Sequence, residues 1–162
     1  MIQIVKDTDT SPLFFLQTAH TTYGMRVMET GHLEHLYYGE RITVDSQDPS
    51  SCAPLVIQRA FAPGNTCTYD REHPQISMED VCLEVGTLGK GDIREPFLEV
   101  RFADGSVTSD FTFDSYEIIT LKEREQCLQD SGLPHSYSEV GTDSAECLQI
   151  VLQDVTNHLE LQ

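Results

Sequence analysis

Alternation of apolar and polar residues over short stretches is the feature of this sequence that most constrains its fold. Three stretches show it most clearly, and their apolar members are Tyr23, Met25 and Val27, then Leu98, Val100 and Phe102, and then Leu148, Ile150 and Leu152. Successive side chains of a strand point to opposite faces of a sheet, so each set places its apolar members on one face. The chain is therefore predicted to build its core from strands.

Short candidate strands recur along the chain, with turn residues between them. The predicted strands are 2–5, 12–18, 22–29, 33–38, 81–88, 97–102, 106–120 and 146–154. Asp104-Gly105 is the strongest hairpin signal, and it predicts a type I′ turn with positive φ at both central residues. Many short strands separated by turns indicate an all-β, antiparallel sandwich. The segment 121–129 carries strong helix formers and is the only stretch expected to form a short helix.

The polar stretches 45–54 and 62–74 are expected to be loops within one domain. No low-complexity linker and no internal repeat divides the 162 residues, a length that suffices for one domain with a core. From Gln149 the pattern predicts a strand, a turn and the start of another strand, which stops at Gln162. Because a domain rarely ends inside such a pattern, we expect the chain to be truncated.

The charge balance argues against several classes of partner. The chain has 27 acidic and 10 basic residues, for a formal net charge of −17. It should therefore repel nucleic-acid backbones and anionic lipids. No apolar run approaches the ~20 residues of a membrane span, and no secretory signal is apparent. The five cysteines are an odd number without a Cys-x-x-Cys pair, which favours a reducing, cytoplasmic setting over a disulfide framework or a zinc ribbon.

No pattern in the sequence joins reactive side chains into a catalytic or metal site. His32 and His35 are three residues apart, which on a strand sends them to opposite faces, so metal ligation is not expected. Acidic residues are too numerous for any pair to indicate a glycosidase site. Gly86, Gly89 and Gly91 do not follow the G-x-G-x-x-G order and are expected in tight turns. Chance pairing of a cysteine with a histidine remains open, but nothing marks one thiol as activated.

Five strings of unusual sequence occur in one order along the chain. They are Thr30–Gly39 (TGHLEHLYYG), Arg59–Asn65 (RAFAPGN), Gly89–Pro96 (GKGDIREP), Asp104–Phe111 (DGSVTSDF) and Gly132–Pro134 followed by Tyr137. Together they resemble the N-terminal region of glycoside hydrolase family 36, the bacterial raffinose- and melibiose-type α-galactosidases. The resemblance extends over roughly residues 2–161.

The resemblance implies a fold and an activity. The family has an N-terminal β-supersandwich, a catalytic (β/α)8 barrel and a small C-terminal β-domain, so residues 1–162 correspond to part of the supersandwich, and the barrel is absent. The family hydrolyses terminal α-galactosyl groups with retention, using two barrel aspartates. The chain itself is therefore expected to be inactive, to need no cofactor or metal, and to serve oligomer assembly and the shaping of the substrate pocket.

Two residues are implied as substrate-binding candidates by the same resemblance. The residue before the Arg-Ala-Phe-x-Pro stretch can contact sugar in the pocket of a neighbouring subunit, often as an aspartate, and here it is Gln58. Its amide can donate to and accept from sugar hydroxyls, but it lacks the stronger charge-assisted bond. Arg59 either fixes the loop or pairs across the subunit contact. The alternative hypothesis is a free-standing carbohydrate-binding or protein-interaction module, which requires an exposed aromatic patch.

Overall fold

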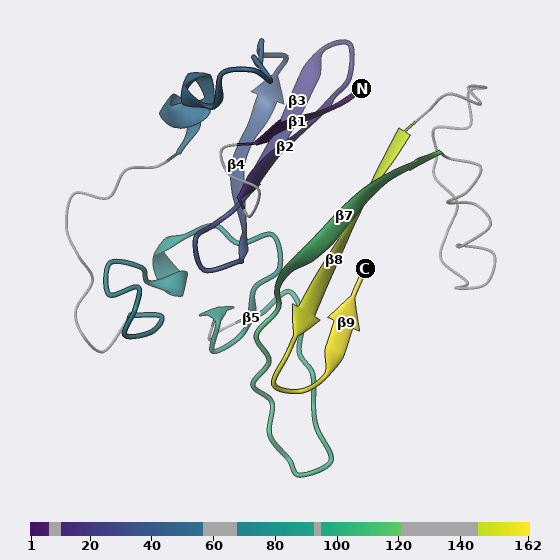
Figure 1. Cartoon of the computed structure of the whole chain (residues 1–162). Coiled ribbons are helices and arrows are strands. Elements are labelled where there is room, and N and C mark those ends of the chain that lie inside the picture. Colours follow the sequence, from purple (N-terminus) through teal and green to yellow (C-terminus); the bar gives the residue numbers. More distant parts are fainter. Residues whose placement is uncertain (7–10, 57–67, 93–94, 121–145) are drawn as a thin grey trace.

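Two antiparallel sheets face each other in the computed structural model, which describes residues 1–6, 11–56, 68–92, 95–120 and 146–162 (Figure 1). The first sheet has the order β1 (Ile2–Lys6), β2 (Pro12–Gln17), β3 (Thr21–Val27) and β4 (Leu33–Glu40). The second sheet has the order β7 (Thr112–Thr120), β8 (Glu146–Asp154) and β9 (Leu159–Leu161). The smaller elements are the 3-10 helices η1 (Pro49–Leu55) and η2 (Met78–Asp80) and the parallel pair β5 (Thr87–Leu88) and β6 (Gly91–Asp92). The all-β, antiparallel sandwich predicted from the sequence is confirmed.

The main core lies between the two sheets. Its buried members are Phe14, Val27, Leu33, Phe111 and Leu152. The ring of Phe14 on β2 meets Tyr116 of β7 edge-on at a centroid distance of 5.1 Å. Such aromatic pairs add specific geometry to the burial of apolar area, which is the dominant stabilising term. Met25 and Val27 of β3 and the alternating apolar residues of β8 thus pack in one shared core, whereas the Tyr23 hydroxyl donates to Glu84.

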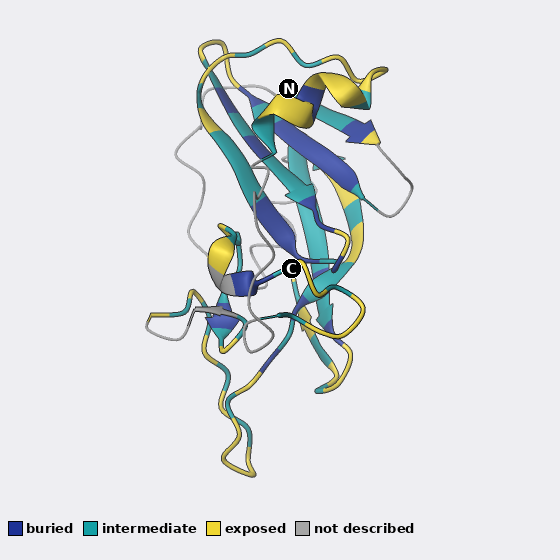
Figure 2. Cartoon of the chain, turned by 90° about the vertical axis from the view of Figure 1, so that its left-hand side faces the viewer, coloured by how far each residue is buried: buried dark blue, intermediate teal, exposed yellow. Residues whose placement is uncertain are grey.

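A second apolar cluster covers the opposite face of the first sheet. Val5, Leu13, Phe15 and Cys52 are buried in it. Cys52 comes from η1, which begins after Asp48, whose side chain accepts a bond from the backbone N–H of Ser50. Figure 2 shows β2 buried along most of its length. Because β2 is covered on both faces, its sequence is a continuous apolar run rather than an alternating one.

The two sheets are joined at both ends of the sandwich. At one end the backbone N–H of Phe113 donates to the carbonyl of Gly31, in the β3–β4 turn, at 2.7 Å. At the other end the backbone N–H of Ile2 donates to the side chain of Glu146 at 3.1 Å. Gly31 has φ +83°, a conformation that glycine adopts at little cost. These contacts fix the sheets relative to each other.

Some predicted strands are wrong in extent. Over 81–88 the structure has the two-residue strand β5, preceded by an isolated bridge between Glu34 and Leu83 on the edge of β4. The segments 97–102 and 106–111 are not strands, because no neighbouring strand among the described residues supplies a hydrogen-bonding ladder to them. In the first of these segments, the side chains of Leu98 and Val100 nevertheless pack against the main core. Apolar alternation therefore indicated the buried face correctly and the backbone pairing incorrectly.

The predicted turn at Asp104-Gly105 exists but is not of type I′. The N–H of Gly105 donates to the carbonyl of Phe102, and Gly105 has φ +87°. Asp104 does not have positive φ, so only one of its two turn residues adopts the conformation that type I′ requires. The Asp104 carboxylate instead accepts bonds from the N–H and hydroxyl of Ser106. These two local bonds favour the turn that is observed.

Other predictions concern the C-terminal half of the chain. The strand, turn and further strand expected from Gln149 onward are confirmed by the β8–β9 hairpin. The helical segment expected at 121–129 lies outside the described residues. Within the described part of the chain, no helix is long and apolar enough to cross a membrane.

Candidate functional site

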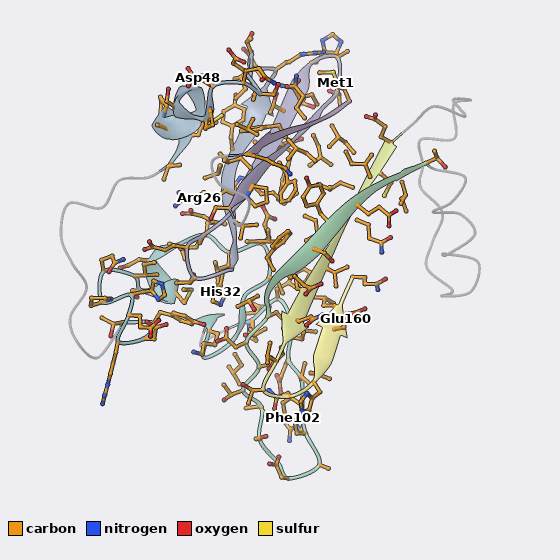
Figure 3. The ribbon with its side chains drawn as sticks, in the orientation of Figure 1. Met1, Arg26, His32, Asp48, Phe102 and Glu160 are labelled. Atoms are coloured by element: carbon orange, nitrogen blue, oxygen red, sulfur yellow. The ribbon has the colours of Figure 1, made fainter. Side chains whose placement is uncertain are left out.

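A partly buried polar cluster lies where the β3–β4 turn meets the segment that leads into β7. We call it the Asp110 cluster, and its members are Thr30, His32, Tyr69, Lys90 and Asp110. Figure 3 shows His32 at the end of the first sheet, next to the segment that carries β5. The members come from four segments that are distant in sequence, and His32 and Asp110 are separated by 78 positions. Only the tertiary fold brings them together.

Tight turns place two members of the cluster. The β3–β4 turn is closed by a bond from the N–H of Met28 to the carbonyl of His32, which fixes His32 at the start of β4. Lys90 sits in a turn closed by reciprocal backbone bonds with Thr87. The buried hydroxyl of Thr87 also donates to the carbonyl of Ser109 at 2.6 Å, next to Asp110. These local turns hold the backbone of both residues in place, and the packing of remote segments then brings their side chains to the same carboxylate.

Three side chains converge on the two carboxylate oxygens of Asp110. His32 Nε2 lies 2.8 Å from Oδ1, while the Tyr69 hydroxyl donates to Oδ2 at 2.9 Å. Lys90 Nζ lies 3.4 Å from Oδ2. The other ring nitrogen of His32 lies 2.9 Å from Thr30 Oγ1, and the His32 side chain is only 3% exposed. Asp110 is therefore the point that all these groups share.

The surroundings of Asp110 keep its carboxylate ionised. Burial by itself would raise the pKa of Asp110, but the hydrogen bond and charge of His32, the charge of Lys90 and the bond from Tyr69 lower this pKa to about 2. Burial, followed by the bond to Asp110, raises the pKa of the Tyr69 hydroxyl. At neutral pH the cluster thus contains a carboxylate and a neutral phenol, which is a strong charge-assisted pair.

A buried acid, Asp154, extends the cluster to the end of β8. Asp154 is 1% exposed, and its Oδ2 accepts from the backbone N–H of Asp110 at 2.9 Å and from the Asn157 amide at 2.6 Å. Burial would raise the pKa of Asp154, but these bonds lower it. Asp154 therefore ties the Asp110 cluster to the β8–β9 hairpin.

The contacts of the cluster hold remote segments of the chain together. Both oxygens of Asp110 and both ring nitrogens of His32 have hydrogen-bond partners within the fold. In the described residues no group of three or more His, Cys, Asp or Glu side chains could hold a metal ion. Burial raises the pKa of the Cys52 thiol, which disfavours a reactive thiolate there.

The structure describes only some of the residues that were singled out from the sequence. Gln58 and Arg59 lie outside the described residues. His35 bonds a different acid from His32, because its Nδ1 lies 3.0 Å from Glu84 Oε1. Tyr38 is 70% exposed on β4.

Sequence reasoning missed the Asp110 cluster, although a signal for it was present. Three of the five resembling strings meet there, because His32, Lys90 and Asp110 belong to different strings. Tyr69 lies outside all of them. The meeting of several strings in space therefore indicates the position of the Asp110 cluster better than the chemistry of any single string does.

Together, the two-sheet sandwich and the Asp110 cluster that ties its segments to one another define an all-β domain. The sequence model of the glycosyl hydrolase family 36 N-terminal domain matches residues 31–162. The chain belongs to this family, as the sequence resemblance indicated.

Relatives of known name agree with this assignment. The bifunctional alpha-galactosidase/sucrose kinase AgaSK of Mediterraneibacter gnavus is 36% identical over 151 residues, covering 92% of this chain and 14% of the relative. Alpha-galactosidase AgaA of Geobacillus stearothermophilus is 30% identical over 148 residues, covering 91% of this chain and 18% of the relative. The chain thus spans less than a fifth of the length of either protein.

Solved structures show the same fold. The crystal structure of AgaA matches with a TM-score of 0.66 and 27% identity, covering 91% of this chain and 19% of that one. The alpha-galactosidase of Lactobacillus brevis matches with a TM-score of 0.64 and 26% identity, covering 91% and 18%. Variants of AgaA have been crystallised with raffinose and with stachyose.

Proposed function

We propose that residues 1–162 are the non-catalytic N-terminal domain of a longer, retaining α-galactosidase. Its substrates would be raffinose- and melibiose-type oligosaccharides. The observation that carries the proposal is the family match over residues 31–162, together with relatives named alpha-galactosidases. The raffinose and stachyose complexes of AgaA variants support the substrate class. The two catalytic aspartates would lie in a barrel that follows residue 162.

The domain would assemble the enzyme and shape its pocket, without contributing a reacting group. In an oligomer, Gln58 and Arg59 would reach the sugar pocket of a neighbouring subunit. The bonds of Asp110 to His32 and Tyr69 support a structural role for this acid. The free thiols of Cys52, Cys82 and Cys147 support a cytoplasmic location, where cysteines stay reduced.

The first experiment reads the gene past codon 162 and assays the complete protein and the 162-residue chain on raffinose and melibiose. We expect the reading frame to continue into a barrel with two suitably placed aspartates, and only the complete protein to hydrolyse the sugars. A stop codon after Gln162 in the native gene would contradict the proposal. In the complete enzyme, Gln58→Ala should raise KM, and unchanged kinetics would remove the substrate contact.

A free-standing carbohydrate-binding module is the second candidate. The exposed ring of Tyr38, whose centroid lies 6.0 Å from that of Tyr23, favours it, because sugars bind on exposed aromatic rings. Titration calorimetry of the 162-residue chain with galactose and raffinose separates the two candidates. Saturable binding without the barrel supports the module, and no heat of binding supports the enzyme domain.

A further inference from the structure

Residues 69–76 form a closed loop, which we call the His73 loop. The backbone N–H of Tyr69 donates to the carbonyl of Ile76 at 2.8 Å, which closes the neck of the loop. The Tyr69 hydroxyl is bonded within the Asp110 cluster, and the Gln75 amide donates to Glu29 Oε1, in the β3–β4 turn, at 2.7 Å. Both ends of the loop are therefore tied to the sandwich by side chains.

The middle of the His73 loop is organised around one histidine–carboxylate pair. His73 Nδ1 lies 2.9 Å from Oδ1 and 3.0 Å from Oδ2 of Asp70. Asp70 Oδ1 also accepts from the backbone N–H groups of Glu72 and His73 at 2.8 and 2.7 Å. A hydrogen bond between two ionised groups is stronger than one between an ion and a neutral group. The charge on the His73 imidazole therefore affects how firmly this part of the loop is held.

The carboxylates that face His73 in the described part of the chain are Asp70, Glu72 and Glu29, and all three favour its protonated form. The bond to Asp70, opposed by desolvation, and the charges of the three acids raise the pKa of His73 above its ordinary value. Desolvation would raise the pKa of Asp70, but the bonds from His73 and from the backbone of Glu72 lower it. The ring of Tyr69 also faces His73, at a centroid distance of 6.3 Å, and burial raises the pKa of its hydroxyl, so it stays neutral.

We propose that the His73 loop is a pH-sensitive element: protonated His73 holds residues 70–73 closed around the Asp70 carboxylate, and they open when His73 loses its proton. The ends of the loop stay tied, because the bonds of Tyr69 and Gln75 to the sandwich do not involve His73. The loop would respond to pH whether or not the complete protein is an α-galactosidase.

The directions of the two pKa shifts set the pH window in which the loop is closed. A histidine with a raised pKa contributes fully below its unfolded value of about 6.5, and the contribution is lost as pH rises through the folded value. The lowered pKa of Asp70 contributes above about 3.9 and is lost as pH falls through the folded value. The loop is therefore closed in mild acid and opens as pH rises past neutrality.

Trypsin measures this opening, because Arg71 is exposed in the middle of the loop and cleavage requires local opening of the chain. Arg101 is an exposed reference site outside the loop, and its cleavage in the same digest carries the pH dependence of the protease itself. Brief digests of the complete protein at about pH 6.5 and about pH 8.5 bracket the titration of a histidine. We expect the ratio of cleavage after Arg71 to cleavage after Arg101, measured by mass spectrometry, to rise roughly twofold to fivefold, as for the loss of an exposed ion pair.

Two variants separate His73 from other titrating groups. His73→Gln removes the titration, so the cleavage ratio should no longer depend on pH. His35→Gln is the matched control, because His35 Nδ1 lies 3.0 Å from Glu84 Oε1 and the two imidazole side chains are similarly exposed, at 28% for His35 and 24% for His73. This control should keep the wild-type dependence on pH.

Three results would overturn the proposal. The first is a cleavage ratio that does not change with pH in the wild-type protein, and the second is a dependence that persists in His73→Gln. The third is a dependence that His35→Gln also abolishes, because a general loosening of the fold then explains both variants. Asp70→Asn gives a direct check: the titration of His73, followed by deuterium exchange at its C2 position, should move to lower pH, and an unmoved titration would equally overturn the proposal.

Discussion

At the scale of single residues, Gly31 sets how closely the two sheets approach each other. It has φ +83°, and a Cβ placed on it would lie 3.0 Å from the Cβ of Thr112 at the start of β7. Its carbonyl also accepts the bond from Phe113 that joins the sheets. Both the backbone conformation and the available space therefore require glycine at this position.

Replacing Gly31 by Ala should destabilise the protein by more than its conformation alone explains. Gly105 is the matched control, because it has φ +87° but a Cβ placed on it would meet nothing within 4 Å. Gly105→Ala should cost about 1–2 kcal/mol for the left-handed conformation. Gly31→Ala should cost at least about 1 kcal/mol more because of crowding. Urea unfolding measures both, and equal losses would show that the contact with Thr112 relaxes freely.

Asp110 makes the stability of the protein sensitive to acid. Its pKa in the folded state is about 2, below the value of about 3.9 in an unfolded chain. A lowered pKa stabilises the fold above the unfolded value and loses this contribution as pH falls through the folded value. We expect the free energy of unfolding to decrease by roughly 2 kcal/mol between about pH 4 and pH 2 from this group.

The variant Asp110→Asn isolates this contribution. It should be less stable than wild type at pH 7, and the difference in free energy of unfolding should shrink as pH falls toward 2. Urea titrations at several pH values measure it. A difference that stays constant over this range would show that the Asp110 carboxylate is not the titrating group.

At the scale of elements, β2 is the strand on which both cores depend. Phe14 and Phe15 are both fully buried, Phe14 between the sheets and Phe15 in the cluster under η1. Because adjacent side chains of a strand point to opposite faces, these two rings share no core. The covering of both faces explains why β2 carries four apolar residues in succession, Leu13–Leu16.

Because the two cores are separate, substitutions of Phe14 and Phe15 should have additive effects on the free energy of unfolding. Phe14→Leu and Phe15→Leu should each cost about 1–2 kcal/mol of stability. The double variant should lose the sum of the two to within about 0.5 kcal/mol, because the substitutions have no shared partners. Urea unfolding of the three variants provides the measurement. A coupling above about 1 kcal/mol would show that β2 transmits strain from one face to the other.

At the scale of the whole molecule, the excess of acidic residues acts on stability. The formal net charge is −17, so like charges repel across the folded surface. Unfolding moves these charges apart. Salt screens their repulsion, because the Debye length falls from about 30 Å at 0.01 M to about 8 Å at 0.15 M ionic strength. The surface charge therefore opposes the compact state most strongly at low ionic strength.

Raising NaCl from about 0.01 to about 0.15 M should increase the urea midpoint of unfolding, because the repulsion is then screened. KCl at equal ionic strength is the control and should give the same shift, since screening does not depend on which monovalent salt supplies it. A midpoint that falls with salt would mean that attractive surface pairs outweigh the net repulsion.

The limits of prediction from the sequence are clearest where the predicted elements differ from the observed ones. The alternation over 97–102 placed Leu98 and Val100 on the core face, yet no strand forms there. A two-residue apolar period indicates which side chains share a buried face. A strand also needs a neighbouring strand with which its backbone forms hydrogen bonds. The candidate site shows the same limit, because Tyr69 and Asp110 carry no local signal of their pairing.

The sequence by itself determined the strand-rich composition of the fold, the buried faces of its strands, the surplus of negative charge and the family to which the chain belongs. These properties follow from local periodicity, from counting charges and from short strings. Only the tertiary structure decided that His32, Tyr69 and Lys90 meet on one carboxylate and that Gly31 faces Thr112. Such contacts depend on distances between remote segments, and those distances exist only once the two sheets have packed together.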